Sequence, residues 1–205
     1  IASVLGPNLL TTVRANIVHD TRDSAFIPGK GHFLDLAYEQ GYGNFVYPRI
    51  DLDARQFFTL KERPDGGNRH IISTIGQVGW MGSEAPFFEK HFAGGFQSFR
   101  GFAFYGVTPV QLGSRVGGQF QALGTLEYML PVTADDTIQL VAFSDMGTVQ
   151  DDVSLSQFRL SVGGGVRLTI PAMGPMPIAL DLGFPIMQQS FDTKQIFAFY
   201  VGVQR

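Results

Sequence analysis

The sequence of 205 residues contains no cysteine, which excludes a disulfide framework and any metal site built on thiolates. The absence of cysteine does not indicate a cellular compartment, because many exported proteins also lack it. Charged residues make up 16% of the chain, below the roughly 25% of ordinary soluble domains. The formal net charge is only -3 at pH 7, so no broad positive field argues for nucleic acid as a partner.

Long apolar runs and catalytic motifs are absent as well. No uninterrupted apolar stretch reaches the 18 or so residues that a transmembrane helix needs. The four histidines have neither HxxxH nor HExxH spacing, and no GxSxG elbow accompanies the serines. The "VGGGV" at 162–166 lies inside an alternating segment with no helix after it, so it does not read as a phosphate loop. We therefore expect no enzyme, no metal site and no cofactor.

What the chain does contain is 25 glycines, 19 phenylalanines and a strict two-residue alternation of apolar with small or polar residues. The alternation is cleanest in Phe158–Ile170. Clusters of Gly, Pro, Asn and Asp separate the segments, whose predicted strands are Leu9–Asp20, Gly31–Gly43, Val46–Leu60, Arg69–Gly82, Gly118–Leu130, Thr137–Val149, Phe158–Ile170, Ile178–Phe184 and Ile196–Arg205. Because most connections are too short for parallel crossovers, we predict one all-β domain of about nine antiparallel, up-and-down strands.

The composition of the two strand faces indicates which solvent each meets. One face is apolar, and the other carries Gly, Ser, Ala, Asp and Arg with very little Lys. Small residues with isolated charges suit the interior of a wide barrel, and strands of about 9 to 11 residues are long enough to cross a membrane when tilted. This pattern favours a transmembrane β-barrel with its apolar face outward. A soluble ligand-binding β-barrel with a phenylalanine-rich core is the alternative.

One connection is exceptional. About 35 residues, from 83 to 117, separate two predicted strands, far more than a hairpin needs. Eight aromatic residues lie in this loop, and they are too apolar to remain solvated at little cost: Phe87, Phe88, Phe92, Phe96, Phe99, Phe102, Phe104 and Tyr105. We predict that the loop folds into the barrel lumen.

Within this loop, "FFEKHFAGGFQSFRGFAFYGVTP" resembles the sixth extracellular loop of the BamA/TamA superfamily of outer-membrane proteins (bacterial surface antigen type). The signature is a hydrophobic residue followed by Arg-Gly-Phe, after a Gly-Gly-x-x-Ser lead-in, and the matching residues are Gly94, Gly95, Ser98, Phe99, Arg100, Gly101 and Phe102. "HDTRDSAFIPGKGHFL" at 19–34 resembles an earlier hairpin of such barrels. "GTLEYMLP" and "FSDMGTV" resemble the two strands after the loop, so the resemblance extends over essentially the whole chain.

The resemblance implies that the arginine of the loop, Arg100, meets acidic residues on the inner wall. The matching positions are Glu127 and Asp145. Independently, the alternation places both carboxylates on the polar face of their strands. A guanidinium between two carboxylates forms charge-assisted hydrogen bonds, so our hypothesis is an intramolecular latch. The alternative is a solvated loop arginine.

The resemblance also implies a fold extent and a function. Family barrels have sixteen strands, so we expect this chain to be the C-terminal part of such a barrel, with the first strands and the N-terminal POTRA repeats outside it. The implied function is assembly of β-barrel proteins in the bacterial outer membrane, with membrane lipid, nascent barrel clients and accessory lipoproteins as partners. A two-partner secretion translocator that conducts an unfolded exoprotein is the alternative within the family.

Overall fold

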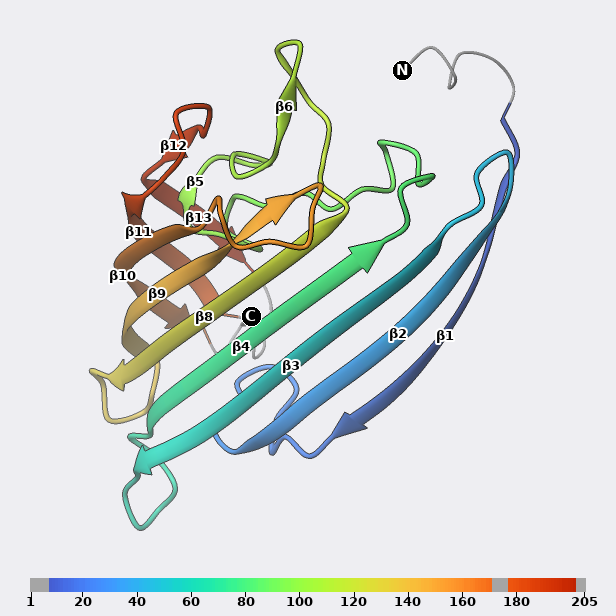
Figure 1. Cartoon of the computed structure of the whole chain (residues 1–205). Coiled ribbons are helices and arrows are strands. Elements are labelled where there is room, and N and C mark those ends of the chain that lie inside the picture. Colours follow the sequence, from blue (N-terminus) through green and yellow to red (C-terminus); the bar gives the residue numbers. More distant parts are fainter. Residues whose placement is uncertain (1–7, 171–176, 202–205) are drawn as a thin grey trace.

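The computed structural model describes residues 8–170 and 177–201, which form one strongly curved sheet (Figure 1). The sheet is antiparallel throughout, and its strands in spatial order are β1 (Leu10–Asp20), β2 (Gly31–Gly43), β3 (Pro48–Lys61), β4 (His70–Met81), β8 (Phe120–Pro131), β9 (Ile138–Gln150), β10 (Arg159–Thr169), β11 (Pro177–Met187) and β13 (Phe197–Val201). Each of these strands pairs with the next long strand along the chain. The predicted all-β, up-and-down architecture is confirmed. In the described ranges no helix is long and apolar enough to cross a membrane.

All nine predicted strands are present, and their ends differ by a few residues. The largest extension is in β11, which continues beyond the predicted Phe184 to Met187. The strand continues through Pro185 because this residue pairs with Ser161 at a register shift, where proline is tolerated. The final positions of the last predicted strand, 202–205, lie outside the described residues.

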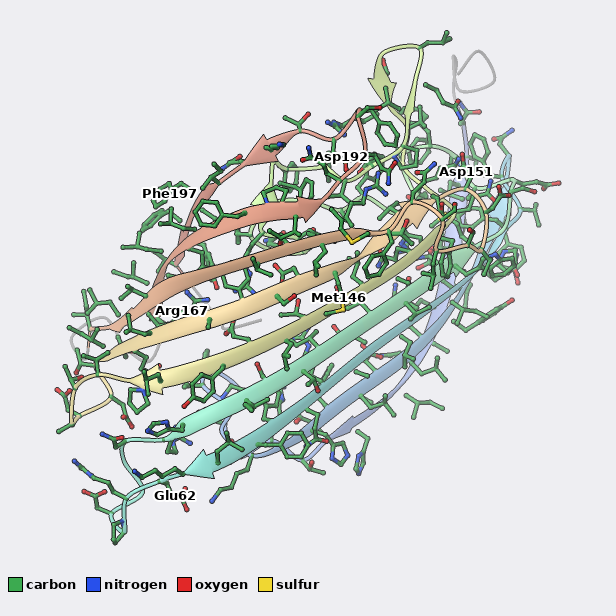
Figure 2. All side chains as sticks on the ribbon, turned by 60° about the vertical axis from the view of Figure 1, so that its left-hand side comes forward. Glu62, Met146, Asp151, Arg167, Asp192 and Phe197 are labelled. Carbon is green, nitrogen blue, oxygen red and sulfur yellow. The ribbon has the colours of Figure 1, made fainter. Side chains whose placement is uncertain are left out.

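The two faces of the sheet meet opposite environments. On β11, Leu180 and Leu182 are 42% and 49% exposed, whereas Ala179 and Asp181 are fully buried. We call the face of the small and polar side chains the inner face and the apolar one the outer face. Figure 2 shows Phe197 projecting from the outer side of the sheet. A soluble barrel would bury its phenylalanine-rich face, so the predicted arrangement, apolar outward and polar inward, is confirmed.

The long loop between β4 and β8 packs on the inner face. It contains three strands of two residues each, β5 (Gly101–Phe102), β6 (Val110–Gln111) and β7 (Ser114–Arg115). β6 and β7 pair with each other, while β5 pairs with β12 (Lys194–Gln195) from the connection between β11 and β13. Strands this short have no alternation to detect, so the sequence did not predict them. A buried apolar cluster joins loop and wall through Ala93, Phe99, Phe102, Val107, Leu123 and Val149.

The orientation of the faces can be tested with neighbouring residues at one depth of β4. Val78 lies on the outer face and is 44% exposed, whereas the Gln77 amide donates to Asp53 Oδ2 on the inner face. We expect Val78→Arg to lower the free energy of folding into lipid vesicles by about 2 kcal/mol, because the guanidinium meets hydrocarbon. Gln77→Arg, the control, should change it by less than about 1 kcal/mol. Equal losses in urea titrations would contradict the assignment of faces.

Candidate functional site

The tip of the long loop is a tight turn built by the lead-in residues of the motif. The backbone N–H of Gly94 donates to Ser98 Oγ at 2.8 Å, and Ser98 Oγ donates to Gly94 O at 3.0 Å. The backbone N–H of Phe99 donates to Gly95 O at 2.9 Å. Gly94 adopts a φ of 124°, a conformation that L side chains rarely adopt. The turn thus fixes the direction in which the chain enters Arg100.

The residues that flank Arg100 hold the loop close to the wall. Phe99 and Phe102 are buried and pack edge to face, with ring centroids 5.1 Å apart. Gly101, with a φ of 89°, lies against Gly183 of β11, and a Cβ on Gly101 would come within 3.1 Å of the Gly183 carbonyl carbon. The backbones of loop and strand therefore touch without side chains between them, which brings Arg100 within reach of the inner face.

Arg100 is fully buried and its guanidinium binds two sequence-predicted partners. Nε and Nη2 donate to the two oxygens of Asp145 at 2.9 Å each, and Nη1 donates to Glu127 Oε2 at 2.6 Å. The ring of Phe143 lies beneath the guanidinium, 3.4 Å from Cζ to the ring centroid. The arginine is therefore enclosed by charges on β8 and β9 and by an aromatic face.

The backbone of Arg100 is held as firmly as its side chain. Its N–H donates to Asp145 Oδ2 at 2.9 Å, and its carbonyl accepts from Ser161 Oγ of β10 at 2.6 Å. Thr125 Oγ1 donates to Asp145 Oδ1 at 2.8 Å. One carboxylate thus organises a backbone amide, a guanidinium and a hydroxyl.

Two charged residues that sequence reasoning did not assign to the site complete it. Asp181 Oδ2 of β11 lies 3.5 Å from Arg100 Nη1, and Asp181 also accepts from Arg167 of β10 at 2.5 and 3.2 Å. Arg167 Nη2 is 3.6 Å from Glu127 Oε2. Two guanidiniums therefore face three carboxylates. Burial alone would lower the pKa of the Arg100 guanidinium, but Glu127, Asp145 and Asp181 outweigh burial and raise that pKa.

Asp181 and Arg167 could not be assigned to the site from sequence because their contact depends on the register of β10 with β11. Asp181 pairs with Gly165 and Arg167 pairs with Ala179, so the two charged side chains are diagonal neighbours on the inner face. The polar positions were evident in the sequence, but this pairing was not.

The loop tip also reaches β13. The ring of Phe96 stacks on Tyr200, with centroids 5.0 Å apart and planes 14° from parallel. Arg167 Cζ lies 5.5 Å from the centroid of the same Tyr200 ring. An aromatic contact therefore extends from the charged cluster to the last described strand.

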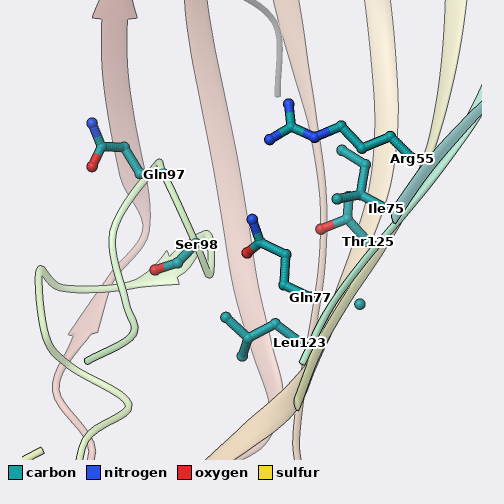
Figure 3. A pocket seen from close by; sticks show the side chains of 8 residues that line it. Arg55, Ile75, Gln77, Gln97, Ser98, Leu123 and Thr125 are labelled. Carbon is teal, nitrogen blue, oxygen red and sulfur yellow. The ribbon is translucent and has the colours of Figure 1, made fainter. Parts of the chain in front are cut away.

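A small cavity lies on the other side of the tip. Its volume is about 40 Å³, and it is lined by Gln97 and Ser98 of the loop and by Gln77 and Thr125 of the wall (Figure 3). A space of this size holds about one or two water molecules. The cavity therefore leaves space between the loop tip and the wall beside β4.

The entry limb of the loop is attached separately. His91 exchanges two backbone hydrogen bonds of 2.9 Å with Gly118, and its Nε2 lies 3.8 Å from Asp51 Oδ1 on β3. Burial, assisted by Arg49 and opposed by Asp51, lowers the pKa of His91 to about 4, so the imidazole is neutral at pH 7. Arg49 Nη1 donates to Glu89 O at 3.3 Å. The loop therefore spans the inner face from β3 to β13.

This arrangement suits fixed attachment of the loop to the wall. The charged groups of the tip are committed to one another, and no group of three His, Cys, Asp or Glu residues within 8–170 and 177–201 is placed to hold a metal ion. Moving a buried guanidinium away from its carboxylates costs free energy, because it leaves buried charges without a partner of opposite sign.

Comparison with known proteins identifies the family. The model of the Omp85 superfamily domain matches residues 1–204. The chain belongs to the Omp85 superfamily. The outer membrane protein assembly factor BamA of Nitratidesulfovibrio vulgaris is 29% identical over 197 residues, covering 88% of this chain and 24% of that protein. The crystal structure of BamA from Haemophilus ducreyi lacking POTRA domains 1–3 matches with a TM-score of 0.79 at 16% identity, covering 93% of this chain and 42% of that one.

These findings confirm the predicted family and barrel fold, and they make the chain a protein of the bacterial outer membrane. At 16% identity, the likeness to the solved structure shows the fold alone. The chain spans about a quarter of the length of the BamA relative that it matches.

Arg100 offers a direct test of the latch hypothesis. We expect Arg100→Ala to destabilise the loop by about 3–5 kcal/mol, because it removes the cation that Asp145 and Glu127 bind and leaves Arg167 facing three buried carboxylates. Arg100→Lys, which keeps the charge but not the planar fork, should retain part of the stability. The measurements are the heat-induced mobility shift of the barrel and the labelling of a cysteine placed at Gln97. If neither changes in Arg100→Ala, the latch hypothesis is wrong.

The close approach of loop and wall can be tested at Gly183. A Cβ there would lie 2.6 Å from Gly101 N and 2.9 Å from the Arg100 carbonyl carbon, both backbone atoms. We expect Gly183→Ala to displace the loop and to cost about 1–3 kcal/mol. Gly76→Ala is the matched control, because its Cβ would meet only Ala54 O at 4.0 Å. Protease cleavage of the loop should rise in the first variant alone, and equal cleavage of both would contradict this packing.

Proposed function

We propose that the protein containing this chain is an outer-membrane assembly factor that promotes the folding and insertion of β-barrel proteins. The observation that carries the proposal is the 29% identity to BamA of N. vulgaris across 88% of the chain. The proposed activity is not enzymatic and uses neither nucleotide nor cofactor, because strand pairing and apolar burial supply its driving force.

We further propose that the chain is the C-terminal part of a sixteen-strand barrel, with the first strands and the POTRA repeats preceding it. The coverage supports this extent, since the chain accounts for 24% of the BamA relative and 42% of the solved BamA chain. The long loop then serves as a latch within the barrel lumen through Arg100, Glu127 and Asp145.

The proposed mechanism is addition of a client strand to the edge of the sheet. Strand edges present unpaired N–H and C=O groups, which template pairing with another chain. The outer face offers the client a surface already apolar enough for lipid, with Phe197 and Phe199 on β13 53% and 55% exposed. The proposed partners are nascent β-barrel proteins, outer-membrane lipid and accessory lipoproteins.

Depletion of the protein in its own bacterium tests the proposal. We expect the amounts of many unrelated outer-membrane barrels to fall together, while periplasmic and inner-membrane proteins hold their levels, because only barrels need the assembly step. Quantitative mass spectrometry of purified outer membranes is the measurement. Loss of a single secreted protein with all barrels unchanged would contradict assembly and indicate a two-partner secretion translocator instead.

A further inference from the structure

A second buried ion pair lies away from the Arg100 cluster. Arg159, at the start of β10, donates from Nε to Asp192 Oδ2 at 3.0 Å and from Nη2 to Asp192 Oδ1 at 2.9 Å. Both side chains are fully buried. Arg159 Nη1 donates to Gln157 O at 2.8 Å, and Asp192 Oδ2 also accepts from the backbone N–H of Gln189 at 2.7 Å. This bidentate pair has the geometry of the strongest ion pairs in proteins.

The pair fixes the connection between β11 and β13, in which Asp192 lies. The next residue, Thr193, accepts from the backbone N–H of Ala103 at 2.8 Å and donates its own N–H to Gly106 O at 3.2 Å. β12 then pairs with β5, Lys194 opposite Phe102 and Gln195 opposite Gly101. Backbone hydrogen bonds therefore join this connection to the part of the long loop that directly follows Arg100.

Residues 101–106 are consequently held from two sides. Gly101 lies against Gly183 of β11, and Thr193 and β12 pair with the same stretch. Asp192 lies at the end of the sheet where Asp151 also lies, opposite the turn that carries Glu62 (Figure 2). β13 begins at Phe197, only a few residues beyond Asp192. The ion pair thus adjoins the residues that pair with this loop segment and lies a few residues before the edge strand.

We propose that Arg159 and Asp192 are positioning residues that form a second latch, which clamps the β11–β13 connection over the long loop and fixes the start of β13. The proposal rests on the assembly function above, in that it names the contact that holds the edge strand in place. It follows that breaking the Arg100 cluster alone leaves residues 101–106 attached to β12, and that release of the loop together with β13 requires the Arg159–Asp192 pair to open.

The test uses the full-length protein in outer-membrane vesicles with Ala198→Cys as a reporter. Ala198 is 8% exposed on the inner face of β13 and lines a cavity with Phe96, Phe102 and Gln195. The 205 residues contain no cysteine, so the label reports this position within them. We expect Asp192→Asn to raise the rate of maleimide labelling of the introduced thiol roughly tenfold, because the connection opens locally.

A double variant separates a latch from a merely buried charge. Arg159→Gln with Asp192→Asn strands no charge, so heat stability should recover toward that of the parent while labelling stays fast. Asp65→Asn is the matched control, since Arg63 and Asp65 form a pair of the same bidentate geometry, at 3.1 and 2.7 Å, in the β3–β4 turn. Labelling at the parental rate in the double variant would overturn the proposal. Labelling does not depend on a client protein, so the two proposals can fail separately. If the assembly assay fails while labelling is fast in the variants, the proposed function is wrong and the second latch still stands.

Discussion

The burial of the Arg100 charge is the constraint on which the rest of the site depends. A guanidinium without water must be matched by carboxylates, and these come from different strands, Glu127 from β8, Asp145 from β9 and Asp181 from β11. The cluster therefore forms only when these strands are in register and curved around the loop. Conversely, without the loop the three carboxylates of the inner wall would have, within the described part of the chain, only Arg167 as a neighbouring cation. Wall and loop each supply what the other lacks.

The faces of the sheet explain why a loop is needed at all. Because the apolar side chains point outward, the inner face offers small and charged residues rather than a hydrophobic core. The loop brings Phe99, Phe102 and Val107 into contact with Leu123 and Val149, so the apolar cluster beside the motif is built largely from loop residues. Glycine is required where that loop meets β11, since a Cβ on Gly183 would lie 2.6 Å from Gly101 N and Gly101 has a φ of 89°.

Sequence alone predicted the strands because their signal is local: a two-residue period within each segment. It also placed Glu127 and Asp145 on the inner face, because alternation within one strand assigns each residue to a face without knowledge of the neighbouring strand. Asp181 and Arg167 were not predicted as residues of the site, because their contact depends on the register between β10 and β11. The ion pair of Asp192 with Arg159 was not predicted for a different reason. Asp192 lies in a connection whose path is set by pairing with β5, a segment far earlier in the chain.

The contacts of the loop differ in strength from one side of the sheet to the other. Toward β8 and β9, Arg100 makes charged hydrogen bonds of 2.6 to 2.9 Å to Glu127 and Asp145, and toward β10 its carbonyl accepts from Ser161 Oγ at 2.6 Å. Toward β3 the contacts are a hydrogen bond of 3.3 Å from Arg49 to Glu89 O and a neutral imidazole 3.8 Å from Asp51. Asp51 itself already accepts from Arg49 at 2.7 Å and lies 3.6 Å from Arg14 of β1. Coulomb attraction to a neutral ring is weak, and Arg14 is half exposed and screened. The β8–β11 wall therefore holds the loop more strongly than β3 does.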